Sequence, residues 1–160
     1  MVEKKMDQYT SHDIQNELLK IMSHYVLRGI AEQLQNSSFL TVMIDETTDV
    51  TNQEQVTIIF RMVDNDLSVK EEFVGLYSVD SITSITLTEV IKDVLLRLNL
   101  SMSKFRGQCY DGCSTMSGTK SGVAKRIMDE EPSAVYTHCY GHSLNLAASD
   151  AIRNSKVMKD

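Results

Sequence analysis

Hydrophobic side chains recur in this chain first at helical spacing and then as a short continuous run. Residues 11–35 carry them at three- and four-residue intervals, and Ser11 is placed to cap the first turn of the helix that this spacing predicts. Residues 39–44 form an apolar run that is too short for a helix, which predicts a buried strand. The polar residues 45–49 are expected to form the loop that follows this strand.

Alternation of apolar and polar side chains replaces helical spacing in the next part of the chain. Residues 55–63 and 69–78 both alternate, and the turn-forming Asp64-Asn65-Asp66 separates them. The first run places its apolar side chains on one face, at Val56, Ile58, Phe60 and Met62. The second run alternates through Glu72, Val74 and Leu76. Two alternating runs joined by a short turn predict a β-hairpin.

Helices and strands are predicted to alternate from residue 86 onward. Residues 86–89, Thr-Leu-Thr-Glu, have the spacing of a capping box, in which the Thr hydroxyl and the Glu carboxylate each bond a free backbone N–H. The helix behind this box shows an apolar stripe at Leu87, Val90, Ile91, Val94, Leu95 and Leu98. A strand at 105–110, a helix near 119–129, a strand at 134–139 and a helix at 142–153 complete the order.

The predicted order is therefore helix, three strands, helix, strand, helix, strand, helix. Three strands with short connections, followed by alternating helices and strands, predict an α/β domain with a mixed sheet and helices packed on it. This is the order of the RNase H-like fold, in which the first and fourth strands lie side by side. We therefore expect Asp45, which ends the first strand, to lie near Asp111, which ends the fourth.

Asp45 and Asp111 are the main candidates for chemistry because each follows an apolar strand. Carboxylates at the ends of neighbouring strands hold divalent metal ions for phosphoryl transfer. The alternative is a turn residue, since Asp is common in turns and Asp111-Gly112 is a frequent turn dipeptide. Glu46 and Asp49 fit indirect contacts to such a metal, but a solvated acidic loop is the preferred interpretation for both.

Composition limits the classes of function. The chain has 160 residues, of which 42% are hydrophobic, and this predicts one domain with a proper core. Three cysteines without a secretory signal indicate a reducing interior, and no apolar run is long enough for a membrane span. The net charge of −6 argues against strong DNA binding by this segment alone. The expected organisation is a disordered segment 1–10, a helical segment 11–36, a core 37–155 and a tail 156–160.

Three motifs resemble hAT-type DNA transposases, especially transposase-derived zinc finger MYM-type proteins. Residues 43–49, Met-Ile-Asp-Glu-Thr-Thr-Asp, resemble the first acidic motif of that family, and residues 110–118, Tyr-Asp-Gly-Cys-Ser-Thr-Met-Ser-Gly, resemble the second. Residues 139–146, Cys-Tyr-Gly-His-Ser-Leu-Asn-Leu, look like the Cys-x-x-His segment that precedes the family's helical insertion. The motifs occur in the family's order, and the resemblance covers residues 11–155.

The resemblance implies an RNase H-like catalytic core that cleaves DNA and transfers its strands with Mg²⁺ or Mn²⁺. Asp45 matches the first acid of the family's triad and Asp111 matches the second, whereas the third acid, a glutamate, is expected beyond Asp160. The resemblance also implies a zinc-finger DNA-binding region and a C-terminal homodimerisation region outside this chain, and a nuclear location. We therefore expect the front part of a split catalytic domain, inactive by itself.

Cys139 and His142 have the spacing of two metal ligands. A structural Zn²⁺ site needs four ligands, and the chain offers no obvious second pair. The resemblance implies that further ligands for such a half zinc site lie beyond the insertion. The alternative is a buried Cys at a strand end with a His in the first turn of the next helix, and the sequence leaves both interpretations open.

Basic residues and the other cysteines carry weaker predictions. Lys120, Lys125 and Arg126 are candidates for contacts to DNA phosphates, although a basic helix face is more often only solvated. Cys109 and Cys113 are interpreted as core or loop thiols, because nothing in the sequence places a base beside either.

Departures from the family pattern leave two functions open. Cys109 and Cys113 stand where the family usually has small residues, often Gly and Ala, and Ser143 stands where an Arg is common. The chain fits the front part of an active transposase, and it also fits a domesticated, inactive DNA- or protein-binding module in the nucleus. A small-molecule α/β enzyme lacks support, because no Gly-rich phosphate loop or Ser/His/Asp arrangement occurs.

Overall fold

The structure is a computed structural model that describes residues 9–64 and 66–154. The disorder predicted for residues 1–10 therefore concerns mostly residues outside this description, and the predicted tail 156–160 lies outside it entirely. The elements are α1 (His12–Asn36), β1 (Leu40–Thr48), β2 (Glu54–Val63), β3 (Val69–Ser78), α2 (Ser84–Arg97), η1 (Met102–Lys104), β4 (Phe105–Tyr110), α3 (Ser114–Ser117), α4 (Val123–Glu130), β5 (Val135–His138) and α5 (Tyr140–Asn154).

The strands form one five-stranded mixed sheet in the order β3-β2-β1-β4-β5. The pairs β1–β2 and β2–β3 are antiparallel, and the second pair is the predicted hairpin. The pairs β1–β4 and β4–β5 are parallel. The predicted α/β fold class is confirmed, and so is the expected adjacency of the first and fourth strands.

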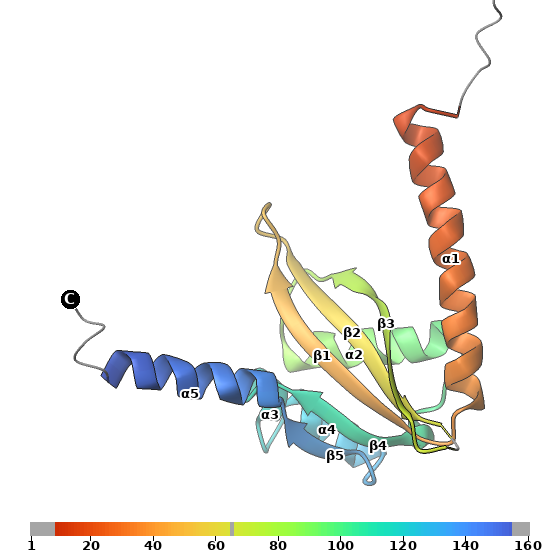
Figure 1. The fold of residues 1–160 in the computed structure, drawn as a ribbon. Helices are drawn as coiled ribbons and strands as arrows, with labels where there is room; N and C mark the ends of the chain where they lie inside the picture. The colour runs from red at the N-terminus through yellow and green to blue at the C-terminus, as the bar shows by residue number, and fades with distance from the viewer. Residues whose placement is uncertain (1–8, 65, 155–160) are drawn as a thin grey trace, which may run out of the picture.

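Two helices cover one face of this sheet. α2 and α4 contact each other and lie behind the strands in the view of Figure 1. The stripe predicted for the first of these helices faces the core, because its buried residues are Leu87, Thr88, Ile91, Val94 and Leu95. From the sheet, β2 contributes the predicted face of Val56, Ile58, Phe60 and Met62, all buried. Helix and sheet thus bury their apolar faces against each other, which is the main source of stability in such a layer pair.

The opposite face of the sheet, which we call the open face, has no helix over it among the described residues (Figure 1). It carries the side chains that alternate with the buried ones, such as Met43 and Asp45 on β1 and Cys109 on β4. These side chains are partly or fully exposed, whereas Val42 and Ile44 on the covered face are buried. Within residues 9–64 and 66–154, the sheet is therefore covered by helices on one side only.

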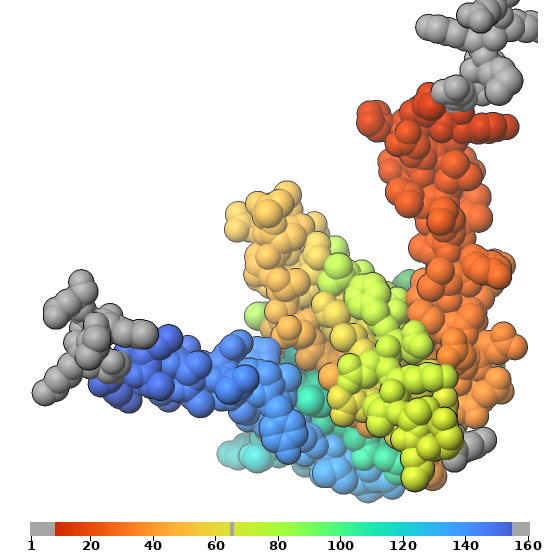
Figure 2. Space-filling model, in the orientation of Figure 1, coloured from red at the N-terminus to blue at the C-terminus, as the bar shows by residue number. Residues whose placement is uncertain are grey.

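Helices α1 and α5 extend away from the body of the molecule (Figures 1 and 2). α1 begins where predicted, since the Ser11 hydroxyl accepts a hydrogen bond from the Ile14 N–H, but it buries only Ile30 and Leu34. α5 buries no side chain at all. The apolar stripes of both helices stay exposed, because an amphipathic helix needs a second layer to bury its apolar face. Neither helix is both long and apolar enough to cross a membrane, and the same holds for the other described helices.

The loop predicted at residues 45–49 is wrong, because β1 continues through Thr48. Asp45 pairs with Thr57, and Thr48 pairs with Glu54 at the far end of the ladder. β2 supplies hydrogen-bonding partners along this whole length, and this outweighs the polar composition of the segment. Asp45 therefore lies inside β1, just after the buried residues of this strand, and not at the end of the strand.

The predicted regular alternation of β3 is also wrong. The register with β2 shifts between Ile58 and Ile59, where Gly75 and Phe73 are the respective partners, so Val74 is an extra residue at a β-bulge. Val74 is buried, but Leu76 two residues later is exposed. A bulge reverses the facing of the residues beyond it, and the sequence pattern alone does not reveal where it falls.

Two helix starts differ from the prediction. α2 begins before the supposed capping box, because the Thr83 hydroxyl accepts from the Thr86 N–H and the Thr88 hydroxyl donates to the Ser84 carbonyl inside the helix. The helix predicted near 119–129 is replaced by the short α3 and by α4. The Gly122 N–H donates to the Gly118 carbonyl between them, and a Cβ at Gly122 would lie 2.5 Å from the Gly118 nitrogen. The two glycines allow this close turn.

Candidate functional site

Parallel pairing of β1 and β4 brings Asp45 and Asp111 to the same edge of the sheet. Met43 lies opposite Cys109 in the ladder, and the two aspartates follow these partners by two residues each. Alternation along a strand keeps Asp45 on the face of Met43, which is the open face. Its side chain is 68% exposed, so the carboxylate is accessible from solvent.

Asp111 is held more firmly than Asp45. Its Oδ1 accepts a hydrogen bond of 3.2 Å from the Cys113 N–H, which closes a turn directly after β4. Its backbone carbonyl accepts from the Tyr136 hydroxyl at 2.9 Å, which ties this turn to β5. The turn interpretation and the metal interpretation of Asp111 are therefore compatible, since the bond from the Cys113 N–H takes up only one of the two carboxylate oxygens.

Glu46 is a third carboxylate at this edge. It lies on the covered face, and its Oε1 is buried without a hydrogen-bond partner among the described residues. Burial raises the pKa of the Glu46 carboxyl, and the negative charges of Asp111, Glu54 and Asp45 raise it further. The interpretation of Glu46 as a solvated loop residue is wrong, because residues 45–48 are a strand and alternation turns Glu46 inward.

Asp45, Asp111 and Glu46 form what we call the acidic edge. This edge meets part of what a divalent cation requires. Carboxylate oxygens are the preferred ligands of Mg²⁺ and Mn²⁺, and a buried oxygen without a partner is one that a cation would satisfy. However, the side chains of Asp45 and Glu46 leave the strand on opposite faces. Within residues 9–64 and 66–154, no three His, Cys, Asp or Glu side chains are grouped closely enough to hold an ion by themselves.

Cys139 and His142 come to this edge from the start of α5. Hydrogen bonds from the backbone N–H and the side chain of His142 lower the pKa of the Cys139 thiol. The same bond to Cys139 raises the pKa of His142, and the charge of Asp45 adds to this effect. The His142 Nε2 lies 4.0 Å from the Asp45 Oδ1. The pair that the sequence singled out thus interacts directly and lies beside the first aspartate.

Cys109 is a neighbour of Cys139 that the sequence did not indicate. Burial raises the pKa of the Cys109 thiol, and the charge of Cys139 and a hydrogen bond with it raise the pKa further. Both cysteines line a cavity of about 510 Å³ on the open face, together with Thr41, Met43 and Gly107. A Cβ at Gly107 would lie 2.7 Å from the Thr41 Oγ1, so the glycine avoids a collision with Thr41 in the lining of this cavity. The interpretation of Cys109 as a core thiol is wrong, since it faces this cavity.

The three basic candidates for DNA contact lie in and before α4. Lys125 forms an ion pair with Asp129, and Arg126 donates to the Ser121 carbonyl at 3.0 Å and to the Ser84 hydroxyl at 3.3 Å. Lys120 is exposed in the turn that precedes the helix. Two of the three cations therefore have partners within the protein, and their contact with phosphate stays a prediction.

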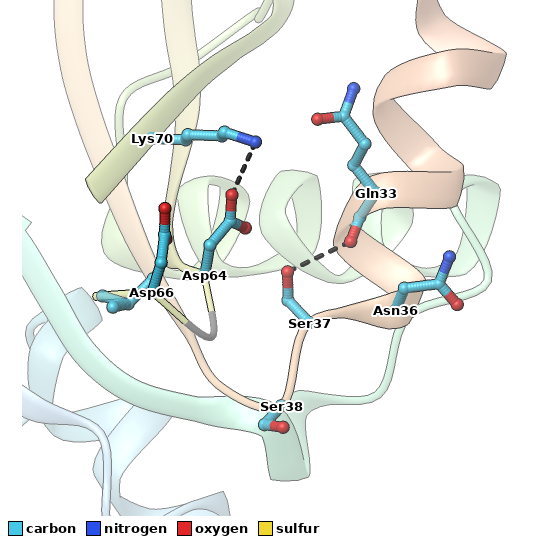
Figure 3. A pocket seen from close by; sticks show the side chains of 8 residues that line it. Gln33, Asn36, Ser37, Ser38, Asp64, Asp66 and Lys70 are labelled. Atoms are coloured by element: carbon cyan, nitrogen blue, oxygen red, sulfur yellow. Dashed lines mark hydrogen bonds and ion pairs between the residues drawn. The ribbon is translucent and has the colours of Figure 1, made fainter. Parts of the chain in front are cut away.

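A second cavity, of about 490 Å³, lies far from these residues, at the end of the sheet where α1 meets β1 (Figure 3). Its polar lining includes Asp64 and Lys70, which form an ion pair of 2.6 Å, and Ser37, whose hydroxyl donates to the Gln33 carbonyl at 3.0 Å. These groups satisfy one another, and the cavity has no link to the acidic edge.

Comparison with known protein families shows to which family the chain belongs. Residues 2–122 match the family described as the ZMYM1/FAM200, RNase-like domain (DUF4371). The chain belongs to this family. The ZMYM1/FAM200 match includes β1, β4 and both aspartates, so the resemblance to transposase-derived zinc finger MYM-type proteins is confirmed over the part of the chain that carries the acidic edge.

Two curated relatives share similarity with this ZMYM1/FAM200 domain over most of its length. The human protein named "52 kDa repressor of the inhibitor of the protein kinase" is 25% identical over 138 residues, which are 86% of this chain and 18% of that protein. The mouse protein of the same name is 27% identical over 137 residues, with the same shares. The chain thus spans about a fifth of the length of the curated relatives that it matches.

Proposed function

We propose that this domain supplies Asp45 and Asp111 as ligands of Mg²⁺ or Mn²⁺ in a hAT-type, transposase-like protein that cleaves and joins DNA. One observation supports the proposal above all: parallel pairing of β1 and β4 brings two aspartates from distant motifs to one edge of the sheet. The orphaned Oε1 of Glu46 at the same edge adds support, because a nearby cation would compensate it.

The two aspartates have different roles in this proposal. A bound Mg²⁺ or Mn²⁺ would supply Lewis-acid chemistry for phosphoryl transfer. Asp45, exposed on the open face, is the ligand that solvent and a DNA strand can approach. Asp111 is fixed at the end of β4 by its bond from the Cys113 N–H, so its carboxylate has a set position for binding the ion. His142, 4.0 Å from Asp45, orients that carboxylate when the imidazole is protonated.

The described residues do not complete such a site, so the proposal requires at least one further ligand. By resemblance it is a glutamate from another part of the complete protein, and the relatives are long enough to contain one. A zinc-finger DNA-binding region and a dimerisation region of the same parent protein would supply the grip on DNA that a chain of net charge −6 does not provide. The nucleus is the compartment that such a function implies.

Mn²⁺ binding measured by paramagnetic broadening of backbone amide NMR signals tests the proposal on this chain. We expect broadening centred on the amides next to Asp45 and Asp111, and a weaker effect in both Asp45→Asn and Asp111→Asn. Asp66→Asn is the matched control, because Asp66 lies beside the other cavity and its change should leave the broadening as it was. Broadening at the acidic edge that is unchanged in the two edge variants would contradict the proposal, because it would show that neither carboxylate holds the ion.

A domesticated, inactive module is the second candidate. Both curated relatives are named as repressors, and such a name fits regulation better than transposition. The cysteines at positions 109 and 113, where the transposases usually have small residues, point the same way. A nicking assay with the full-length parent protein and its Asp45→Asn variant separates the two candidates. Metal-dependent nicking that the variant abolishes supports the transposase, and equal, background-level nicking supports the module.

A further inference from the structure

A groove lies at the outer edge of the sheet, where β3 is the last strand. It is a cavity of about 450 Å³ that is lined by residues 74–77 of β3, by one side of α1 and by the end of α2. α1 contacts β3 and stands beside it in Figure 1. The Gln35 Nε2 ties α1 to the end of α2 by donating to the Leu98 carbonyl at 2.7 Å. We call this cavity the α1–β3 groove, and the fold itself holds its walls in place.

The base of the α1–β3 groove is apolar. Among its lining residues, Val74 belongs to the hydrophobic core, and Leu27, Tyr77 and Leu98 pack against that core. Leu76 also lines the groove, and its side chain is 55% exposed. The volume falls within the range of roughly 300–1,000 Å³ that is usual for ligand sites. The groove therefore offers both space and apolar contact area to a ligand.

The charged lining of the α1–β3 groove is entirely basic. His24 and Arg28 come from α1 and Arg97 from α2, and within the described part of the chain no carboxylate is among the lining residues. Asp93 accepts from the Arg97 Nε at 2.7 Å, which occupies only one of the five N–H donors of this guanidinium. The chain as a whole has a net charge of −6, so this lining is a local exception. It favours an acidic ligand, because arginine binds carboxylates through strong charge-assisted hydrogen bonds.

The backbone of β3 presents hydrogen-bonding groups at the same place. The Val79 N–H donates to the Glu54 carbonyl at 3.0 Å, so these two residues form a hydrogen-bonded pair that continues the antiparallel ladder of β2 and β3. Such pairs alternate along a ladder. Tyr77 is therefore bonded to β2, whereas the N–H and C=O groups of Leu76 and Ser78 point away from β2, toward the outer edge. These outward groups are the ones that an added strand would bind.

The two halves of β3 differ in how strongly they oppose the addition of another strand. The first half carries Lys70, Glu71 and Glu72, and charged side chains on an edge strand hinder pairing with a further strand. Residues 74–78 carry no charged side chain. The unprotected half of β3 is thus the half that borders the basic groove. In peptide recognition by strand addition, main-chain bonds provide affinity and neighbouring side chains provide specificity, and both are present here.

We propose that the α1–β3 groove binds an extended acidic segment of a partner protein. The segment adds to β3 as a further strand and places a carboxylate against Arg28 and Arg97. A second copy of the chain fits the groove less well, because residues 74–78 of its own β3 would bring no carboxylate to the two arginines. The proposal does not depend on metal binding or on activity toward DNA.

Titration of the whole, isotope-labelled chain with synthetic peptides tests the proposal. The probe is a blocked octapeptide in which valine and aspartate alternate, so that all its carboxylates lie on one face of the extended strand. We expect shifts of the backbone amide NMR signals of Leu76 and Ser78, and slower hydrogen exchange of both amides. The same peptide with lysine in place of aspartate should cause neither effect.

Substitutions in the groove test the role of charge. Arg28→Gln and Arg97→Gln should each weaken binding of the aspartate peptide by about tenfold, because each removes a charged donor to its carboxylates. Arg153→Gln is the matched control, since it removes the same charge from α5, outside the groove, and should leave the affinity unchanged.

Methylation of the peptide backbone tests strand addition without altering the protein. Successive residues of a strand direct their N–H groups to opposite edges, so methylating either the valine or the aspartate nitrogens removes donors from one edge only. We expect one of the two methylated peptides to lose binding and the other to keep it.

Four results would overturn the proposal. They are the same affinity for both methylated peptides, binding of the lysine peptide as tight as that of the aspartate peptide, no binding of the aspartate peptide, and unchanged affinity in both groove variants. Slow exchange of the Leu76 amide without any peptide, lost on dilution, would also overturn it, because a second copy of the chain would then occupy the groove.

Discussion

Gln108 is a fully buried polar side chain at the centre of β4. Its amide nitrogen donates to the carbonyls of Ala124 and Ala134, and its amide oxygen accepts from the Tyr110 hydroxyl. These bonds connect β4 to α4 and to the segment before β5. The side chain thereby gives partners to the Tyr110 hydroxyl and the Ala134 carbonyl, and it adds a second bond to the Ala124 carbonyl inside α4.

Replacing Gln108 by Leu should destabilise the domain although it adds an apolar group. The Tyr110 hydroxyl and the Ala134 carbonyl would lose these bonds in the buried core, and this should cost about 1–3 kcal/mol. Urea unfolding measures the loss. Gln33→Leu on the exposed side of α1 is the matched control and should change stability by less than about 0.5 kcal/mol. Equal stability of the two variants would show that the buried network contributes nothing.

The ionised side chain of Glu46 should lower the stability of the folded domain at neutral pH. Its pKa is raised in the folded protein, so the folded state binds this proton more tightly than the unfolded state does. The stability from that proton is complete below the unfolded pKa of about 4.3 and is lost as the pH rises through the higher folded value. Glu46→Gln should therefore raise the melting temperature at pH 7 and not at pH 4.

The gain in the free energy of unfolding of Glu46→Gln at pH 7 should stay under about 1 kcal/mol, because solvent screens a carboxylate that is only partly buried. Thermal unfolding at the two pH values, with the exposed Glu89→Gln as control, checks the sign. A variant that is less stable than the unchanged chain at pH 7 would mean that ionised Glu46 has a partner, such as a bound cation.

Single residues at the acidic edge could be found from the sequence only in part. Asp45 and Asp111 stood out because each follows an apolar run, and that signal is local. The neighbours of Glu46 and the cavity that Cys109 and Cys139 share depend on strand register, which involves residues far apart in the chain. Two β-branched threonines after Glu46 were the available sign that the strand continues.

At the scale of elements, α1 is a helix with two different parts. Its last turns bury Ile30 and Leu34 against the body, and its earlier apolar residues project into solvent. Leu34→Ala should therefore cost about 2–5 kcal/mol, as is usual for a large residue removed from a core. Urea unfolding measures the change.

Leu18→Ala is the control for Leu34→Ala, because it removes the same group from the same helix at a position that is 47% exposed. We expect a change within about 0.5 kcal/mol, since alanine is the better helix former and little contact is lost. A large loss of stability at Leu18 would mean that the early part of α1 packs against something in solution.

Element types followed from periodicity, but their ends and their packing did not. The stripe of α2 was read from the sequence and faces the core, since a sheet lies beneath it. The stripes of α1 and α5 predicted helices equally well, yet periodicity does not say whether a second layer is present to cover them. The Val74 bulge and the Gly118–Gly122 turn were not predicted from the sequence for a related reason. Both depend on how the chain fits against neighbouring elements.

At the scale of the whole molecule, one-sided packing should divide the domain into parts of different local stability. β1, β2 and β4 bury their apolar side chains against α2 and α4, whereas α5 buries none. Isolated helices of this length are marginal in water, so α5 should open far more often than the sheet. Hydrogen exchange followed by mass spectrometry should show α5 and the first half of α1 exchanging well before α2.

The comparison with α2 makes this exchange experiment decisive, because α2 and α5 have nearly equal lengths of 14 and 15 residues. Protection of α5 equal to that of α2 would contradict the prediction and would indicate a covering partner, for example a second copy of the chain. Dilution of the sample would identify such self-association, since protection that comes from a second copy falls with concentration.

The architecture as a whole was predictable because order and connection length restrict it so strongly. A hairpin, then a helix, then a strand parallel to the first leaves few arrangements open, and the sheet order follows from them. The open face was not predictable from the pattern. Its side chains, such as Met43 and Cys109, are of types found equally in a second buried layer.

Gly107 shows how a residue without a functional group can govern chemistry. Its missing side chain lets Thr41 fit against β4, and these strands carry Asp45 and Asp111 further along. An added methyl group at position 107 would collide with the Thr41 side chain, and we expect the resulting shift between β1 and β4 to extend to the ends of both strands. A position without any side chain therefore helps to hold together the two strands that carry the carboxylates, and a search for important residues by chemical reactivity alone would overlook it.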